Sequence, residues 1–82
     1  MKLLVIDDEK PVLEMLELSL ASEGYEVLTA ENGHEGLQIF ADESPDIVIT
    51  DIKMPGVDGI EVLKRIKNSG SEAEVIVITG HG

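Results

Sequence analysis

Short apolar segments alternate along this chain with longer segments in which apolar residues recur at helical spacing. The run from Lys2 to Ile6, which ends in Asp7, has no alternation of apolar and polar positions. Such runs are typical of strands buried on both faces of a parallel sheet. Three further segments are predicted to be strands, at residues 26–30, 47–50 and 74–79.

The segments between these strands have the periodicity of amphipathic helices. The first helix is predicted to start at Pro11 and to end near Gly24, the second to span residues 34–41, and the third to follow a turn at residues 55–59. The residues expected to face inward are Val12, Leu13, Leu16, Leu20, Leu37, Phe40, Ala41, Ile60, Val62, Leu63 and Ile66. The order βαβαβαβ predicts an α/β fold with a parallel sheet and right-handed crossovers.

The composition indicates one small domain over residues 1–82. Hydrophobic residues make up 43% of the chain, which argues against disorder. The core must be aliphatic, because Tyr25 and Phe40 are the two aromatic residues. The chain has no cysteine, no signal-peptide pattern and no apolar run of about 18 residues, so we expect a soluble, cytoplasmic protein without disulfides.

The chain is strongly acidic, with 17 Asp and Glu residues against six Lys and Arg and a formal net charge of −11. A surface of this charge repels phosphate backbones and anionic lipids. We therefore expect no direct binding to nucleic acid and no association with membranes.

Three of the predicted strands end in residues with side-chain oxygens: Asp7 and Asp8, Asp51, and Thr79. The carboxyl ends of parallel strands lie at one edge of the sheet, where ligands bind in open α/β folds. Two carboxylates about 4 Å apart repel by about 4 kcal/mol at an effective dielectric constant of about 20, so such a cluster favours a hard cation such as Mg²⁺. The Thr79 hydroxyl and the Gly80 amide would then face a phosphoryl oxygen at an open coordination position.

Each of these residues also has an ordinary structural interpretation. Asp7 and Asp8 suit the first turn of a helix, where negative charge is favourable. Asp51 suits the start of a turn, and Thr79 suits any strand. The coincidence of these residues at three strand ends favours the site over the separate explanations.

Other classes of site fit the sequence less well. His34 and His81 are far apart and lack neighbours of the kind that ligate metals, and neither a nucleophile–base pair nor a phosphate-binding loop motif is present. A Mg²⁺-dependent phosphatase with Asp51 as nucleophile would commonly have a second acid two positions later. This chain has Lys53 there.

Three segments, Val5–Glu9, Asp51–Gly59 and Val77–Gly80, give the chain a specific resemblance to the response-regulator receiver domains of two-component signalling. The resemblance runs over the whole chain. It implies a flavodoxin-like sheet, with strand order 2-1-3-4 for the strands present here, and a protein that is not an enzyme beyond weak self-catalysed phosphorylation and dephosphorylation.

The resemblance also implies a role for each site residue. Asp51 would accept a phosphoryl group from a histidine kinase or a phosphotransfer protein. Mg²⁺ would be held by Asp7, Asp8, Asp51 and the backbone carbonyl of Lys53. Thr79 would be the hydroxyl that moves toward the phosphoryl group, and the backbone of Lys53 and Gly80 would contact it.

The sequence departs from the family pattern after Gly82, where receivers continue through a helix, a strand with a phosphoryl-contacting lysine, and a further helix. We therefore expect a truncated receiver in which phosphorylation is impaired. The fourth strand would be an open apolar edge, which invites pairing with another chain, so we expect a homodimer or a domain-swapped assembly. The alternative is a structural fragment that assembles through this edge and keeps a vestigial site.

Overall fold

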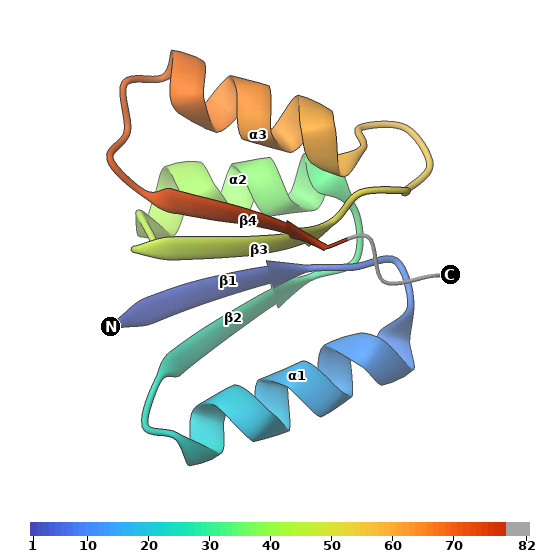
Figure 1. The fold of residues 1–82 in the computed structure, drawn as a ribbon, viewed down its shortest axis with the longest axis vertical. Coiled ribbons are helices and arrows are strands. Elements are labelled where there is room, and N and C mark those ends of the chain that lie inside the picture. Colours follow the sequence, from blue (N-terminus) through green and yellow to red (C-terminus); the bar gives the residue numbers. More distant parts are fainter. Residues whose placement is uncertain (79–82) are drawn as a thin grey trace.

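The computed structural model describes residues 1–78 of the chain, and within them one sheet is flanked by helices on both faces. The elements are β1 (Lys2–Ile6), α1 (Lys10–Ser22), β2 (Glu26–Ala30), α2 (Gly33–Glu43), β3 (Ile47–Asp51), α3 (Gly59–Asn68) and β4 (Glu74–Ile78). All the strand pairs are parallel, and the order is β2-β1-β3-β4 (Figure 1). The predicted fold class and strand order are confirmed.

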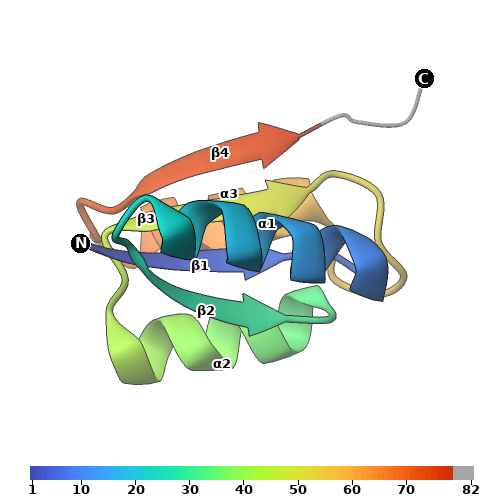
Figure 2. The same ribbon diagram turned by 90° about the horizontal axis from the view of Figure 1, so that it is seen from below.

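The strand order decides on which face each helix lies. The chain moves from β1 outward to β2, and then returns past β1 to β3 and β4. Because crossovers between parallel strands are right-handed, this reversal puts α1 on one face and both α2 and α3 on the other, as Figures 1 and 2 show. The reversal also makes the carboxyl ends of β1 and β3 the topological switch point of the sheet.

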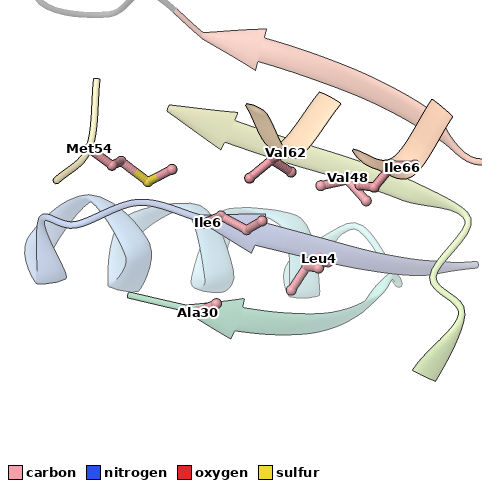
Figure 3. Close-up of a cluster of buried hydrophobic side chains, with 7 residues drawn as sticks. All are labelled: Leu4, Ile6, Ala30, Val48, Met54, Val62 and Ile66. Carbon is pink, nitrogen blue, oxygen red and sulfur yellow. The ribbon is translucent and has the colours of Figure 1, made fainter. Parts of the chain in front are cut away.

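The main core lies between the sheet and the two helices α2 and α3. Figure 3 shows its buried side chains, which come from the strands, the segment after β3 and α3. Its buried members are Leu4, Ile6, Ala30, Val48, Met54, Val62 and Ile66. Phe40 packs against this cluster from α2 and is partly buried. The core is therefore aliphatic, as the composition predicts.

Two details of the helices differ from the sequence-based expectation. Ala41 and Ile60 were expected to face inward, but both are exposed, Ile60 to 38%. Ala41 lies in the last turn of α2, which runs on to Glu43 and ends where Ser44 adopts a left-handed conformation with φ 47°. Ile60 lies on the same side of α3 as the exposed residues Lys64 and Lys67, whereas Gly59, Val62 and Ile66 form the buried side of this helix. None of the helices in the described part of the chain is long and apolar enough to cross a membrane.

Candidate functional site

Three aspartates meet at the switch point of the sheet. β1 and β3 are neighbours with Ile6 opposite Thr50, so the residues that follow these two positions lie side by side. Asp7, Asp8 and Asp51 each place a carboxylate oxygen such that the three oxygens lie within 4.8 Å of one another. The parallel register therefore gathers residues from two segments of the chain that are more than 40 positions apart.

Two of the three carboxylates are almost removed from solvent. Asp7 is 5% exposed and Asp51 is 4% exposed, whereas Asp8 is exposed. Burial raises the pKa of the Asp7 carboxyl, and the negative charges of Asp51 and Asp8 raise it further. The backbone amide of Glu9 opposes this pKa shift by donating a hydrogen bond of 2.8 Å to Asp7 Oδ1. Asp7 is thus a carboxylate whose charge is costly in the absence of a cation.

The donor set suits a hard divalent cation. All three side chains offer carboxylate oxygens, which Mg²⁺ and its relatives prefer over nitrogen and sulfur ligands. Clustered carboxylates repel one another, and a cation bound between them would convert this repulsion into attraction. Because Asp8 is exposed, such an ion would keep one side toward solvent and toward an incoming ligand.

The backbone around Asp51 is fixed on several sides. Asp51 is the last residue of β3, and the amide of the next residue, Ile52, donates to the carbonyl of Ile78 at 3.1 Å. The fully buried hydroxyl of Thr50 donates to the Asp51 carbonyl at 3.0 Å. Gly59 packs so closely on the same carbonyl that a Cβ there would overlap it. The end of β3 therefore has little freedom to move.

Residues 52–58 form the β3–α3 loop, which follows directly after Asp51. The amide of Gly59 donates to the carbonyl of Ile52 at 3.0 Å, which closes the loop at its base. Met54 is buried and joins the main core, and Gly56 has φ 77°, a left-handed conformation that glycine adopts without strain. Asp58 ends the loop by capping α3, its Oδ1 accepting from the amide of Glu61 at 2.9 Å.

The family of the chain follows from comparison with known proteins. The family model described as "Response regulator receiver domain" matches residues 3–82. The chain belongs to the response-regulator receiver domain family. The predicted resemblance is thereby confirmed.

Solved receiver structures resemble this receiver closely in sequence and fold. A response regulator receiver domain protein from Clostridium thermocellum is 47% identical with a TM-score of 0.91, and the match covers 99% of this chain and 66% of that protein. TrrA from Thermotoga maritima, solved in complex with Mg²⁺-BeF, is 43% identical with a TM-score of 0.93 and coverages of 99% and 70%. TrrA has also been solved in complex with the histidine kinase ThkA. In that structure the match has 43% identity and a TM-score of 0.90, and it covers 99% of this chain and 70% of the matched chain. The chain thus spans about two thirds of the length of these relatives.

The remaining sequence-predicted site residues have different positions in this receiver. Lys53 lies in the β3–α3 loop and is exposed, two residues after Asp51. Thr79 and Gly80 lie outside the described residues, as does His81. His34 is exposed on α2.

Sequence reasoning missed Thr50, which helps to hold the site in place but has the residue type of an ordinary strand position. It also missed the close contact of Gly59 with the Asp51 carbonyl, although the resemblance to receiver domains implies that Gly59 shapes the loop around the acceptor. The pattern of apolar residues does indicate that Thr50 is buried, because it follows Ile47, Val48 and Ile49 in the same run. Apolar periodicity does not show that a Cβ on Gly59 would meet a carbonyl, whereas a Cβ on Gly24 or Gly70 would face open space.

Proposed function

We propose that this chain is the phosphoacceptor module of a two-component response regulator, with Asp51 as the acceptor. The observation that carries the proposal is the buried Asp51 at the end of β3, with carboxylate oxygens of Asp7 and Asp8 within 4.8 Å. Membership of the receiver family supports it, as does the similarity to TrrA, which was solved with Mg²⁺-BeF.

In the proposed reaction, a carboxylate oxygen of Asp51 attacks the phosphorus of a phosphohistidine. An O–P bond forms, the P–N bond to the histidine breaks, and the product is an acyl phosphate on Asp51. The carboxylates of Asp7, Asp8 and Asp51 and the backbone carbonyl of Lys53 would hold Mg²⁺. When bound, Mg²⁺ neutralises these acids and stabilises the negative charge on the phosphoryl oxygens.

The chain's own residues would orient the acceptor. Thr50 and Gly59 fix the Asp51 backbone, so that the carboxylate is presented at the rim and not toward the core. The hydroxyl of Thr79 and the amide of Gly80 would receive phosphoryl oxygens. Each chain would accept one phosphoryl group, and its self-catalysed phosphorylation and dephosphorylation would be weak at most.

The proposed donor is a sensor histidine kinase or a phosphotransfer protein, and we propose that the chain meets it in the cytoplasm. The complex of TrrA with the histidine kinase ThkA supports this choice of partner. With a net charge of −11, these residues would not bind nucleic acid directly.

Acceptance by residues 1–82 as an isolated polypeptide is proposed to be slow. Four of its six cations engage other groups: Lys2 contacts Glu43, Lys10 contacts Glu31, Arg65 contacts Glu61, and Lys67 contacts the carbonyl of Ala73. Lys53 and Lys64 are exposed. A developing charge on the phosphoryl group would therefore lack a fixed ammonium partner.

The test is incubation with acetyl phosphate and Mg²⁺, followed by intact mass measurement. We expect a slow gain of one phosphoryl group, which requires Mg²⁺ and is lost in Asp51→Asn. Asp42→Asn, which changes an exposed aspartate at the end of α2, is the matched control and should be phosphorylated like the parent. Phosphorylation of Asp51→Asn at the parent rate would refute the assignment of the acceptor.

A second proposal concerns assembly, and the exposed edge of β4 favours it. Within residues 1–78, β4 pairs with β3 on one side and with no described strand on the other, and Ile76 in this strand is 50% exposed. Exposed apolar edge strands pair readily with other chains. We propose a homodimer, formed by edge pairing or by exchange of elements, in which assembly and not phosphoryl transfer would be the alternative role of the chain.

Sedimentation and light scattering test this assembly at micromolar concentration. We expect a dimer or larger species that Ile76→Lys converts to monomer, because a charged side chain on an edge opposes pairing. Glu72→Lys, an exposed substitution outside the strand, is the control for added charge. A well-folded monomer of the parent chain would contradict the proposal.

A further inference from the structure

The β3–α3 loop lies against the first turn of α2, and the contact is closest at Gly33. A Cβ on Gly33 would overlap the carbonyl oxygen of Val57 and would come within 2.9 Å of Val57 Cβ and Cγ1. Contacts below about 3.0 Å from a Cβ do not occur without a shift of one partner, and here one of the obstacles is backbone. The helix and the loop are therefore packed at the distance that a residue without a side chain permits.

The helix side of this contact is firmly held. Asn32 caps α2 with its Oδ1, which accepts from the amide of Glu35 at 2.8 Å. The Glu35 carboxylate in turn accepts from the amide of Glu31 at 2.7 Å, which ties the preceding residue to the same turn. One turn later, Gly36 packs against the side chain of Ile6 in the core. A group inserted at Gly33 would therefore displace the loop more readily than the helix.

The loop side transmits such a displacement toward the site. The loop has seven residues and is closed at its base by the Gly59–Ile52 hydrogen bond of 3.0 Å. Val57 packs partly against the core, and Lys53 lies four positions before it in this short segment. A shift of Val57 must be absorbed by the residues between these two points, because both ends of the loop are fixed.

We propose that Gly33 is a positioning residue for the cation site: its lack of a side chain lets α2 hold the β3–α3 loop in the conformation that presents the Lys53 carbonyl. This inference rests on the proposed function, in which that carbonyl is a Mg²⁺ ligand. It assigns to the start of α2 a role in a site to which α2 contributes no ligand. Residues that orient metal ligands typically alter metal affinity by about 10- to 100-fold when they are changed.

The test compares two alanine substitutions on the same helix by isothermal titration with Mg²⁺. Gly33→Ala is expected to raise the Mg²⁺ Kd about 10-fold. Gln38→Ala, at an exposed position of the same helix, is the control and is expected to change the Kd by less than about 2-fold. Equal Kd values for Gly33→Ala and the parent would overturn the proposal. A parent chain that binds no Mg²⁺ would overturn the proposed function, and this inference with it.

Hydrogen exchange in the absence of Mg²⁺ separates positioning from general destabilisation. Gly33→Ala is expected to speed amide exchange in residues 52–59 selectively, whereas Gln38→Ala is expected to leave that segment unchanged relative to the rest of the chain. If Gly33→Ala does not fold, exchange is measured on the parent chain without Mg²⁺. A β3–α3 loop that is already ordered before Mg²⁺ binds requires the Gly59 amide, which donates to the Ile52 carbonyl, to be protected from exchange. Exchange of that amide at the rate of an open chain would overturn the proposal.

Discussion

The two faces of the sheet differ in how completely the described helices cover them. Val48 and Val75 point toward α2 and α3, where Val48 belongs to the buried core and Val75 packs against it. Because side chains alternate along a strand, Ile49 and its register partner Ile76 point to the α1 face. There Ile49 is half-buried and Ile76 is 50% exposed.

The helices on the two faces also differ in how their first turns are capped. α2 and α3 begin with side-chain caps from Asn32 and Asp58, whereas α1 begins at Lys10 and its cap residue Glu9 makes no side-chain cap hydrogen bond. The comparison of the two faces shows that an apolar strand sequence does not ensure that helices cover both faces of that strand. β3 and β4 are apolar on both faces, but coverage depends on where the crossover helices lie.

The largest expected effect comes from shortening one isoleucine on each face. Ile66→Ala, in the α3 side of the core at 1% exposure, should lower the free energy of unfolding by about 3 kcal/mol, because it leaves a cavity. Ile76→Ala should cost about 1 kcal/mol or less, because half of that side chain is already in contact with solvent. Urea denaturation of the two variants measures the difference. Equal losses would mean that Ile76 is covered in solution.

A smaller effect is expected at the aspartate cluster, which lies at the rim between the two faces. Asp7→Asn removes one of three clustered charges and keeps an oxygen to accept from the Glu9 amide, so the metal-free protein should gain about 1.5 kcal/mol of stability at neutral pH. The same substitution should abolish Mg²⁺ binding. Asp42→Asn serves as a control for the change of charge, since Asp42 is exposed near the end of α2.

The pH dependence of this gain follows from the raised pKa of Asp7. Between the unfolded value of about 4 and the raised folded value, the native state holds more protons than the unfolded chain. The stability of the parent should therefore fall as pH rises through that window and stay lower above it, and Asp7→Asn should lack this fall. Denaturation curves with and without Mg²⁺ check the sign. A parent that becomes more stable relative to Asp7→Asn as pH rises through the window would contradict it.

The smallest expected effect is at the cap of α2. Asn32→Ala should cost about 1 kcal/mol, because the amide of Glu35 loses its acceptor. Asn32→Asp should retain the cap and the stability. Thermal unfolding compares the two variants. If Asn32→Ala has no effect, capping does not hold the start of α2, and the rigidity attributed to that side of the Gly33 contact is lost.

The sequence was sufficient for the strand order and the family, and it pointed to the three aspartates that the structure brings together. The strand order and the family came from the resemblance to receiver domains, whereas the parallel sheet and the three aspartates followed from periodicity and from residue type at strand ends. The exposure of Ala41 and Ile60 was not predicted, because an apolar residue type alone does not say which side of a helix packs against the sheet; Ile60 shares its side of α3 with the exposed Lys64 and Lys67. The contacts of Gly33 and Gly59 were not predictable either, because they depend on how closely elements distant in sequence approach one another.

The central place of β1 has a consequence for the order in which this protein can form during synthesis. β1 leaves the ribosome before the other strands, yet it lies between β2 and β3 in the sheet. The hydrogen bond from the Asp46 amide to the Lys2 carbonyl, which joins β1 to the start of β3, spans 44 positions. Contacts of such long sequence separation slow folding. In an order of folding that follows synthesis, Asp7 and Asp51 would meet when β3 docks on β1, and their repulsion would oppose that step and not the joining of β1, α1 and β2. A divalent cation in the surrounding solution should accordingly speed the docking of β3 and leave the first βαβ unit unaffected.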